Sequence, residues 1–388
     1  MTAAVQNVPR ICFVGLKNLG LLAPEYGRLG TGGAELQQTL LARALARRGF
    51  PVSMVVADYG QSDGAVWNGV QTYKAFRPEQ GIPVLRFIHP RWTGLWSALA
   101  RADADIYYTS CAGALVGQVA LFARLRARQF VFWAASDTDC DPRALLIRYW
   151  RDRHLYRYGL RRANLVFTQS VQQQQAMAHN FGRESRVVES LIEPAASPRP
   201  FCERDIDVLW VANLRPLKRP EVLFQLARQL PQLSFHMIGG PMTGGEALFR
   251  AVAAEAATIA NVTFHGAVPY HAVGGFFSRA RVFANTSSIE GFPNTYLQAW
   301  ANGVPVVAFI DPQGLLSRLS LGQAVNETSE MTQAVARFAR DLPAWEEASR
   351  RSRKYMDDAH NESRVLGPYL EALRELWVPR RAATAQPG

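Results

Sequence analysis

The sequence is poor in cysteine and in charge, and it has no long hydrophobic run. Its four cysteines, at positions 12, 111, 140 and 202 of 388, lie far apart without a CxxC pair, so we expect neither a disulfide framework nor a zinc site. The most apolar stretch, residues 112–123, is well short of the roughly 20 residues that cross a bilayer. The first residues lack a small-residue cleavage pattern, so we expect a first strand there rather than a signal peptide. Together these absences favour a cytoplasmic protein.

The charged residues make up only 19% of the chain, and they are unbalanced. Lys and Arg number 43 against 32 Asp and Glu, which gives a net charge of +11. Such an excess favours a nucleic acid, an anionic membrane surface or a phosphate-bearing small molecule as partner, without choosing among them.

Short β-branched and aromatic runs alternate with helical patterns along the chain, which predicts βαβ units and parallel sheets. A proline-rich stretch at 194–200 interrupts the rhythm. We therefore predict an α/β fold of two Rossmann-like domains, residues 1–196 and 197–361, followed by a packing helix and tail at 362–388. Ligands of such sheets bind outside the carboxyl ends of the strands, so we expect the active site in a cleft between the domains. The predicted strands are 11–15, 52–56, 84–88, 105–109, 130–134, 164–168, 206–211, 234–238, 262–265, 281–284 and 304–309.

A glycine-rich turn opens a predicted helix in the first half. Gly32 and Gly33 stand where the helical spacing of leucines begins, and glycines at a helix start let an anion approach backbone N–H groups. The chain has neither Walker spacing nor the full GxGxxG pattern, so a tight turn without a ligand is an equal alternative.

Two segments of the second half carry residues suited to a diphosphate. Arg215 and Lys218 follow the strand at 206–211, and a guanidinium fork with an ammonium can hold two phosphates; solvated surface cations are the simpler alternative. Glu290 follows the strand at 281–284, and a helix that begins at Asn294 presents a second set of amides to an anion.

In this order the segments resemble the group 1 glycosyltransferases, the retaining GT-B enzymes of family 4. The likeness rests on Gly32 to Glu35, Arg215 with Lys218, Gly239 and Gly240, Phe264 to Val268, Glu290 to Pro293, and Gly303 to Val307. It implies a GT-B fold with an acceptor-side N-terminal domain and a donor-binding C-terminal domain. It also implies transfer of a sugar, with retention, from a UDP- or GDP-linked donor to a glycan or lipid-linked acceptor, with no cofactor and no metal.

The resemblance assigns roles to residues. Arg215 and Lys218 would hold the diphosphate and act in catalysis with Glu290, which would hold the donor sugar hydroxyls. The remaining donor-binding candidates are Gly32, Gly33, Gly239, Val268 near the base, Gly291, Phe292, Pro293 and Asn294 at the distal phosphate, and Gln298 at the ribose. Two positions depart from the family pattern: Gln298 replaces a glutamate, and Asn213 replaces an arginine.

The first half lacks the histidine that family members often carry after the strand at 130–134. Ser136, Asp137 and Asp139 stand there and are candidates to contact the donor sugar or the acceptor, with an Asx turn that caps the next helix as an equal alternative. His89, expected at a strand end, is another candidate. The Asp137-Thr138-Asp139 run also matches the metal signature of GT-A transferases, but residues 103–105 and 205–207 match equally well, so we expect no metal.

Residues 143–162 carry seven arginines interleaved with aromatic residues. As a helix, this segment could lie on anionic lipid headgroups, which fits peripheral attachment to the inner face of a membrane, or bind an acidic glycan. A solvated helix is an equal alternative. No RNP, KH or helix-turn-helix pattern accompanies the segment, so we expect no nucleic-acid partner.

Two other function classes stay open at this point. A catalytically silent glycan- or nucleotide-binding protein of the same fold would explain Gln298 and the missing histidine. An NAD-dependent Rossmann enzyme shares the strand rhythm, but the chain lacks GxGxxG followed by an acidic residue about 20 positions later.

Overall fold

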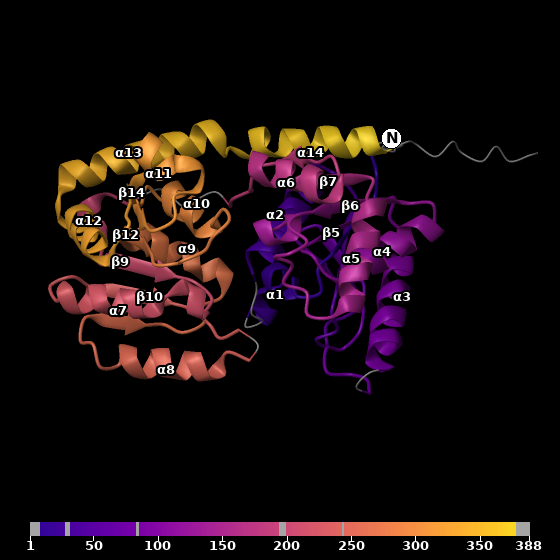
Figure 1. The fold of residues 1–388 in the computed structure, drawn as a ribbon, viewed down its shortest axis with the longest axis horizontal. Helices are drawn as coiled ribbons and strands as arrows, with labels where there is room; N and C mark the ends of the chain where they lie inside the picture. The colour runs from indigo at the N-terminus through magenta and orange to yellow at the C-terminus, as the bar shows by residue number, and fades with distance from the viewer. Residues whose placement is uncertain (1–7, 28–31, 83–84, 194–198, 243, 378–388) are drawn as a thin grey trace, which may run out of the picture. The chain divides into compact units, whose positions relative to one another are not determined.

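The computed structural model describes residues 8–27, 32–82, 85–193, 199–242 and 244–377 (Figure 1). The chain forms two compact units: the first comprises Met1–Leu22, Ala34–Glu189 and Ser363–Gly388, and the second comprises Ala23–Gly33 and Ser190–Glu362. Most of the predicted linker and the whole predicted tail lie outside the described residues. Both units are α/β structures with a parallel sheet, as predicted.

The first unit is built on a sheet with the strand order β3-β4-β2-β1-β5-β6-β7-β8. Its central strand, β1 (Ile11–Val14), pairs in parallel with β2 and β5, so that Ile11 faces Val52 and Ile106. Among the described strands only β3 and β4 pair antiparallel. The other strands are β2 (Val52–Val56), β3 (Val66–Trp67), β4 (Val70–Lys74), β5 (Ile106–Ser110), β6 (Gln129–Trp133), β7 (Leu165–Thr168) and β8 (Arg186–Val187).

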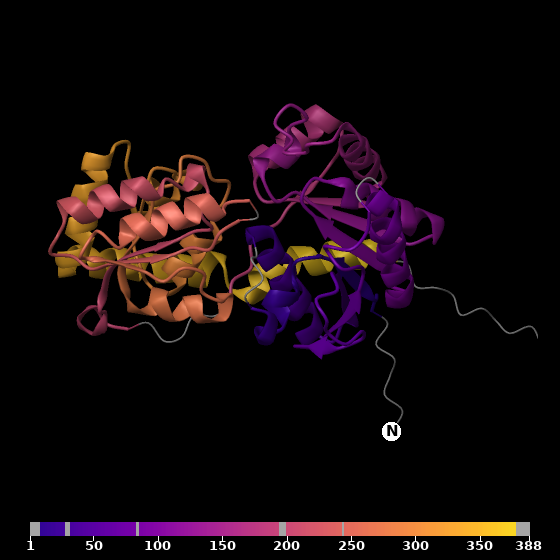
Figure 2. The same cartoon turned by 90° about the horizontal axis from the view of Figure 1, so that it is seen from below.

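The second unit has a parallel sheet with the order β11-β10-β9-β12-β13-β14. Consecutive residues of β9 point to opposite faces: Trp210 joins the core formed with α7 and α12, whereas Leu209 joins the core formed with α9 and α10. Helices accordingly lie on both sides of these strands (Figure 2), which explains why the strands read as continuous apolar runs. The strands are β9 (Ile206–Val211), β10 (Phe235–Ile238), β11 (Val262–Phe264), β12 (Ala280–Asn285), β13 (Val306–Ala308) and β14 (Gly322–Ala324).

Most of the α-helices lie in the connections between these strands, and α12, α13 and α14 follow the last strand. In the first unit the helices are α1 (Leu19–Leu22), α2 (Gly33–Arg47), α3 (Thr93–Ala102), α4 (Ala114–Leu125), α5 (Trp150–Arg162), α6 (Val171–Phe181) and α14 (Glu362–Leu376); α2 and α14 each begin one residue before the unit boundary. In the second they are α7 (Pro220–Gln229), α8 (Glu246–Ala256), α9 (Tyr270–Arg279), α10 (Asn294–Ala301), α11 (Leu315–Leu319), α12 (Thr328–Arg340) and α13 (Leu342–Ala359). None of the helices in the described ranges is both long and apolar enough to cross a membrane.

The C-terminal helix α14 packs on the first unit. The Tyr369 ring lies 5.0 Å from the Phe167 ring, and the Tyr369 hydroxyl donates to the Glu189 carbonyl at 3.3 Å. Leu366 and Leu373 are fully buried on the same face, as the periodicity of this helix predicts.

One predicted strand, at 84–88, is wrong. Residues Leu85–Phe87 form a 3₁₀ turn, and Ile88–Trp92 continue as a wider helical turn. Leu85 and Ile88 are exposed, so this apolar run has no sheet to join. His89 therefore does not end a strand; it is exposed, with Nδ1 2.9 Å from the Thr93 hydroxyl.

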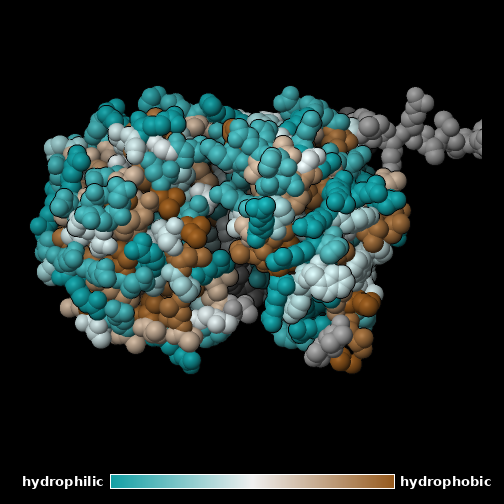
Figure 3. All heavy atoms as spheres, in the orientation of Figure 1, coloured by the Kyte–Doolittle hydropathy of each residue, from teal (hydrophilic) through white to brown (hydrophobic). Residues whose placement is uncertain are grey.

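The arginine-rich segment is only partly helical. Helix α5 begins at Trp150, and residues 143–149 form turns and irregular structure instead of the expected helix. The face of the molecule seen in Figure 3 is mainly hydrophilic and is broken by separate hydrophobic patches.

Candidate functional site

Two loops of the second unit meet at the carboxyl edge of its sheet, because β9 and β12 are neighbours there. The loop after β9 carries Lys218, and the loop after β12 carries Glu290. The backbone N–H of Ser288 donates to the Leu217 carbonyl at 2.9 Å, and the Thr286 hydroxyl donates to the Lys218 carbonyl at 2.6 Å. The strand order therefore joins two segments that are far apart in the sequence.

Lys218 and Glu290 form an ion pair at this edge. Nζ of Lys218 lies 2.5 Å from Oε1 of Glu290, and the side chains are 18% and 14% exposed. A pair this far removed from water interacts more strongly than a surface pair. Two of the three residues to which the resemblance assigns a catalytic role, Lys218 and Glu290, are thus in direct contact.

Further donors fix the Glu290 carboxylate. The Ser287 hydroxyl donates to Oε1 at 2.7 Å and the Asn285 amide at 3.4 Å, while Asn285 Oδ1 accepts from the Ser287 backbone at 2.9 Å. Within the described part of the chain, every hydrogen bond to this carboxylate ends on Oε1. Oε2 is consequently available to accept from a ligand hydroxyl.

A buried tryptophan supports the Lys218 loop from below. The indole N–H of Trp210 donates to the Thr286 hydroxyl at 2.9 Å, and that hydroxyl donates in turn to the Lys218 carbonyl. Asn285 and Thr286 were not among the residues predicted from the sequence. The only signal for them is a polar run at the end of a buried strand, which says nothing of their partners.

Helix α10 begins at Asn294, directly after the turn at 291–293, as predicted. Gly291 is exposed, Phe292 is half-buried and Pro293 is buried. The first amides of a helix carry partial positive charge. The turn therefore places a helix N-terminus next in sequence to the Glu290 carboxylate.

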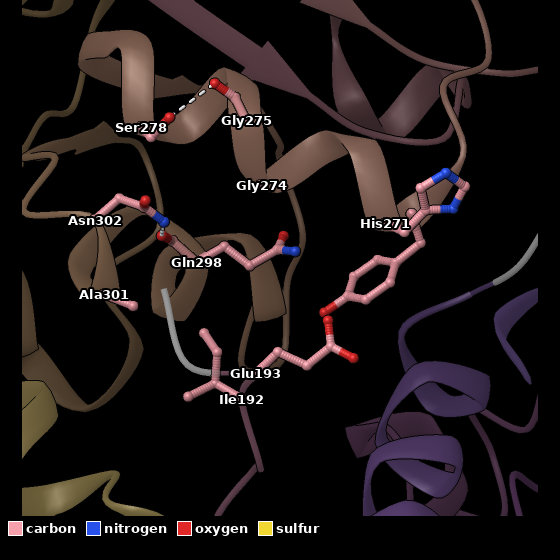
Figure 4. Close-up of a pocket in the computed structure, with 10 residues that line it drawn as sticks. Ile192, Glu193, His271, Gly274, Gly275, Ser278, Gln298, Ala301 and Asn302 are labelled. Atoms are coloured by element: carbon pink, nitrogen blue, oxygen red, sulfur yellow. Dashed lines mark hydrogen bonds between the residues drawn. The ribbon is translucent and has the colours of Figure 1, made fainter. Parts of the chain in front are cut away.

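Gln298 lines a cavity of about 260 Å³ in the second unit. Figure 4 shows its side chain extending from α10 toward the space bordered by Glu193 and His271. Ser278 and Asn302 add polar groups to the lining. Gly274 and Gly275 line the α9 side of the cavity and have no side chains to fill it. A wall that combines amide and hydroxyl groups with the Glu193 carboxylate suits hydroxyl-bearing ligands.

Arg215 is not part of the Lys218–Glu290 cluster. It is exposed, and among the described residues its side chain reaches only the Met242 sulfur, at 3.9 Å. The neighbouring Arg219, which the sequence analysis did not single out, stacks on the Phe309 ring with 4.7 Å to the centroid. The Arg215 and Lys218 side chains are therefore not already placed together for the predicted joint binding of a diphosphate.

Packing explains the glycine at Gly239. A Cβ atom there would lie 2.5 Å from the Ala212 carbonyl oxygen, because the loops after β9 and β10 run close together, with the Leu214 N–H donating to the Gly240 carbonyl at 3.0 Å. Val268 is half-buried and precedes α9. The roles predicted for Gly239 and Val268 at a donor stay predictions.

In the first sequence half, Gly32 directly precedes α2 and Gly33 begins it, as predicted. The helix also carries a buried polar cluster that the sequence analysis missed. The Asn18 amide donates to Gln38 Oε1 at 2.9 Å and lies 3.1 Å from the Thr39 hydroxyl. A Cβ on Gly15 would lie 2.3 Å from Gln38 Oε1. This cluster fixes the loop after β1 against α2.

For Ser136 and Asp139 the structure shows the capping alternative. Ser136 and Asp139 form a capping box around the 3₁₀ turn Asp137–Cys140, and the buried Asp139 carboxylate also accepts the Ala112 and Ala135 N–H groups. Burial raises the pKa of Asp139, against the lowering effect of these hydrogen bonds. Asp139 is thus a structural residue, whereas Asp137 is exposed and accepts from the Gln173 amide at 2.9 Å.

The other Asp-x-Asp runs hold arginines. Asp103 and Asp105 pair with Arg10 and Arg128. Asp205 and Asp207 pair with Arg279 and Arg281. Across the described ranges, no group of three His, Cys, Asp or Glu side chains is arranged to hold a metal ion.

Two family models match the chain. The model described as "Glycosyl transferases group 1" matches residues 196–360, and the "Glycosyl transferase 4-like domain" model matches residues 32–191. The two matches follow one another and together take in most of the sequence.

Curated relatives match shorter segments. A D-inositol 3-phosphate glycosyltransferase of Mycolicibacterium paratuberculosis is 27% identical over 195 residues, which is 47% of this chain and 44% of the relative. One from Mycobacterium leprae is 33% identical over 105 residues, 26% of this chain and 24% of the relative. The chain thus matches from a quarter to under half of the length of these relatives.

Solved structures share the fold over nearly the whole chain. Sucrose-phosphate synthase from Thermosynechococcus elongatus has a TM-score of 0.72 at 18% identity and covers 95% of this chain and 98% of its own. HepE from Anabaena, solved with UDP and glucose, has a TM-score of 0.71 at 16% identity, with coverages of 94% and 99%. Identities this low establish the GT-B fold alone. The two family models, which together take in most of the sequence, show that the chain belongs to the group 1 glycosyl transferases.

Proposed function

We propose that this chain is a retaining, metal-independent glycosyltransferase that moves a sugar from a UDP- or GDP-linked donor to a glycan or lipid-linked acceptor and needs no cofactor. The observation that carries the proposal is the Lys218–Glu290 pair, whose carboxylate stands four residues before the start of α10 in the sequence. A cation and a helix N-terminus can bind a diphosphate, and a carboxylate oxygen can accept hydrogen bonds from sugar hydroxyls.

The proposed reaction breaks the bond between the sugar C1 and the distal phosphate oxygen. The acceptor oxygen bonds to C1 on the same face, and the acceptor proton passes to the departing phosphate oxygen. Negative charge builds on that phosphate, and fixed positive groups stabilise it best when they are held in place beforehand. Lys218 meets this condition, because an ammonium has three N–H donors and Glu290 occupies one.

The remaining roles follow from the same arrangement. Oε2 of Glu290 accepts from hydroxyls of the donor sugar, and Gln298 hydrogen-bonds the ribose from the wall of its cavity. The exposed Arg215 side chain, whose contact among the described residues is the Met242 sulfur at 3.9 Å, turns toward the diphosphate when the donor binds. Gln298 supplies no negative charge, so we expect a weaker hold on the ribose than a glutamate gives.

The comparisons support a nucleotide-sugar donor by analogy. HepE has been solved with UDP and with UDP-glucose, and the curated relatives are named as glycosyltransferases. For the acceptor, the arginine-rich segment favours an anionic glycan or a lipid-linked molecule, with the protein attached peripherally to a membrane.

A donor panel tests the proposal. Purified protein is incubated with UDP- and GDP-sugars, with and without EDTA, while donor binding and hydrolysis are measured. We expect one nucleotide to bind and its sugar to be hydrolysed at the same rate with EDTA present. Coupling constants of the product's anomeric proton then report retention, once an acceptor is found.

Lysine variants separate this site from the rest of the surface. Lys218→Ala should abolish turnover, whereas Lys354→Ala, an exposed lysine of α13, should leave it unchanged. Donor binding without hydrolysis by the unaltered protein would favour the catalytically silent alternative. No interaction with any nucleotide sugar would refute the proposal.

A further inference from the structure

Exposed hydrophobic side chains of the first unit are concentrated in two short segments. Among the described residues of this unit, five of the nine exposed large hydrophobic side chains lie in these segments, Leu85 and Ile88 in one and Leu146, Tyr149 and Trp150 in the other. The remaining four are Val66, Ile82, Leu125 and Val171. Leu146 is 85% exposed and Trp150 is 74% exposed. Side chains of this size are rarely left so exposed in a group without a partner.

The two segments form one surface, which we call the Trp150 patch, comprising Leu85, Ile88, Leu146, Tyr149 and Trp150. The Arg151 guanidinium lies 3.4 Å from the centroid of the Phe87 ring and 5.8 Å from that of Tyr149. It thereby joins the turn at 85–87 to the start of α5. Figure 3 shows hydrophobic side chains exposed at the lower end of the unit that contains α3, α4 and α5.

The backbone before α5 directs these side chains outward. Leu145 and Ile147 are buried in the core of the unit, while Leu146 and Arg148 between and after them are exposed. The alternation anchors the segment by one set of residues and presents the other set to the outside. The exposure of Leu146 is therefore built into the fold.

The surroundings of the patch are strongly basic. Residues 143–162 contain seven arginines and one acidic residue, Asp152, and Asp152 is paired with Arg151. Arg86 and Arg148 are exposed and stand next to patch residues in the sequence. Aliphatic and indole side chains among arginines complement the interface of an anionic bilayer, where hydrophobic groups enter the headgroup boundary and cations meet lipid phosphates.

We propose that the Trp150 patch docks this protein on an anionic lipid bilayer, with Leu146 and Trp150 inserted between headgroups and the surrounding arginines on lipid phosphates. The inference rests on the membrane attachment in the proposed function and deepens it. It places the contact on the turn at 85–88 and the segment before α5, and only the first turn of the basic helix takes part.

Vesicle sedimentation of the full chain tests the docking. We expect the protein to pellet with vesicles of phosphatidylcholine mixed with phosphatidylglycerol, to pellet poorly with phosphatidylcholine alone, and to be released by salt. The double variant Leu146→Glu, Trp150→Glu should weaken partitioning by at least about tenfold. Arg148→Ser should weaken it by about fivefold, which corresponds to about 1 kcal/mol per basic residue at an anionic surface.

Leu125→Glu is the matched control, because Leu125 is 64% exposed in the same unit but lies outside the patch. It should bind vesicles as the unaltered protein does. Failure to pellet with anionic vesicles, equal binding to neutral vesicles, or patch variants that bind as well as the control would each overturn the proposal. Donor hydrolysis without vesicles should be the same for all these variants, so a failed docking test leaves the transferase proposal intact.

Discussion

Removing the charge of Lys218 should weaken both folding and donor binding, and the two effects can be separated. In Lys218→Met, the Glu290 carboxylate keeps only the Ser287 and Asn285 donors on Oε1 and loses its counter-charge at 14% exposure. Exposed pairs contribute about 0–1 kcal/mol and breaking a fully buried pair costs about 3–5 kcal/mol. For this intermediate burial we expect a loss of about 2 kcal/mol in the free energy of unfolding, or about 4–8 °C in Tm.

The double variant Lys218→Met, Glu290→Gln separates stability from function. With no charge left unpaired, we expect calorimetry to show most of the lost stability restored. Titration with UDP and GDP should still show affinity for the preferred nucleotide reduced by at least about tenfold, because a charged hydrogen bond to phosphate contributes about 1.5–3 kcal/mol. A Lys218→Met protein with unchanged Tm and nucleotide affinity would refute the reasoning.

Three further predictions concern stability. Arg204→Leu should lower the free energy of unfolding by about 4 kcal/mol, because the 1% exposed guanidinium donates to four carbonyls. Arg228→Leu, at an exposed arginine, should lower it by under about 1 kcal/mol. Similar urea midpoints for the two variants would contradict this. His236 and His265, with Nδ1 and Nε2 3.0 Å apart, have pKa values lowered from 6.5, chiefly by burial. The folded chain thus binds fewer protons than the unfolded chain, and stability present above about pH 6.5 is lost as the pH falls. Replacing both with Gln should flatten this profile between pH 5 and 7. Asp139→Asn should cost about 2 kcal/mol in urea unfolding, because backbone N–H groups lose a charged acceptor, and an unchanged midpoint would argue against it.

The strands could largely be predicted because a parallel strand buried on both faces is a continuous apolar run. The same signal failed at residues 85–88, since composition does not reveal whether an apolar run has a surface to pack on. The β3–β4 hairpin was missed although its turn, Asn68-Gly69, has φ angles of 51° and 78°. A two-residue hairpin turn needs such positive φ angles, and Asn-Gly is the dipeptide that adopts them most readily. The sequence signal for the hairpin was therefore present.

The candidate site was predictable only as far as single residues were concerned. Lys218 and Glu290 stand out by type and by their place after strands, and the resemblance gave them roles. Thr286 acts through a hydrogen bond between two loops, and Asn285 acts through hydrogen bonds within the loop after β12. Such pairings follow from the tertiary structure. Asp139 shows the converse, because a carboxylate after a strand can serve either a ligand or the backbone.

Trp210 links the interior of the second unit to the charge at its edge. Its ring packs in the core with α7 and α12. Its indole N–H donates to the Thr286 hydroxyl, and that hydroxyl donates to the Lys218 carbonyl. Under the proposed function, donor affinity therefore depends on a side chain that is itself buried in the core. A Phe at this position would keep the apolar volume and still loosen the lysine, so sequences that tighten or relax donor binding could do so by exchanging a core residue.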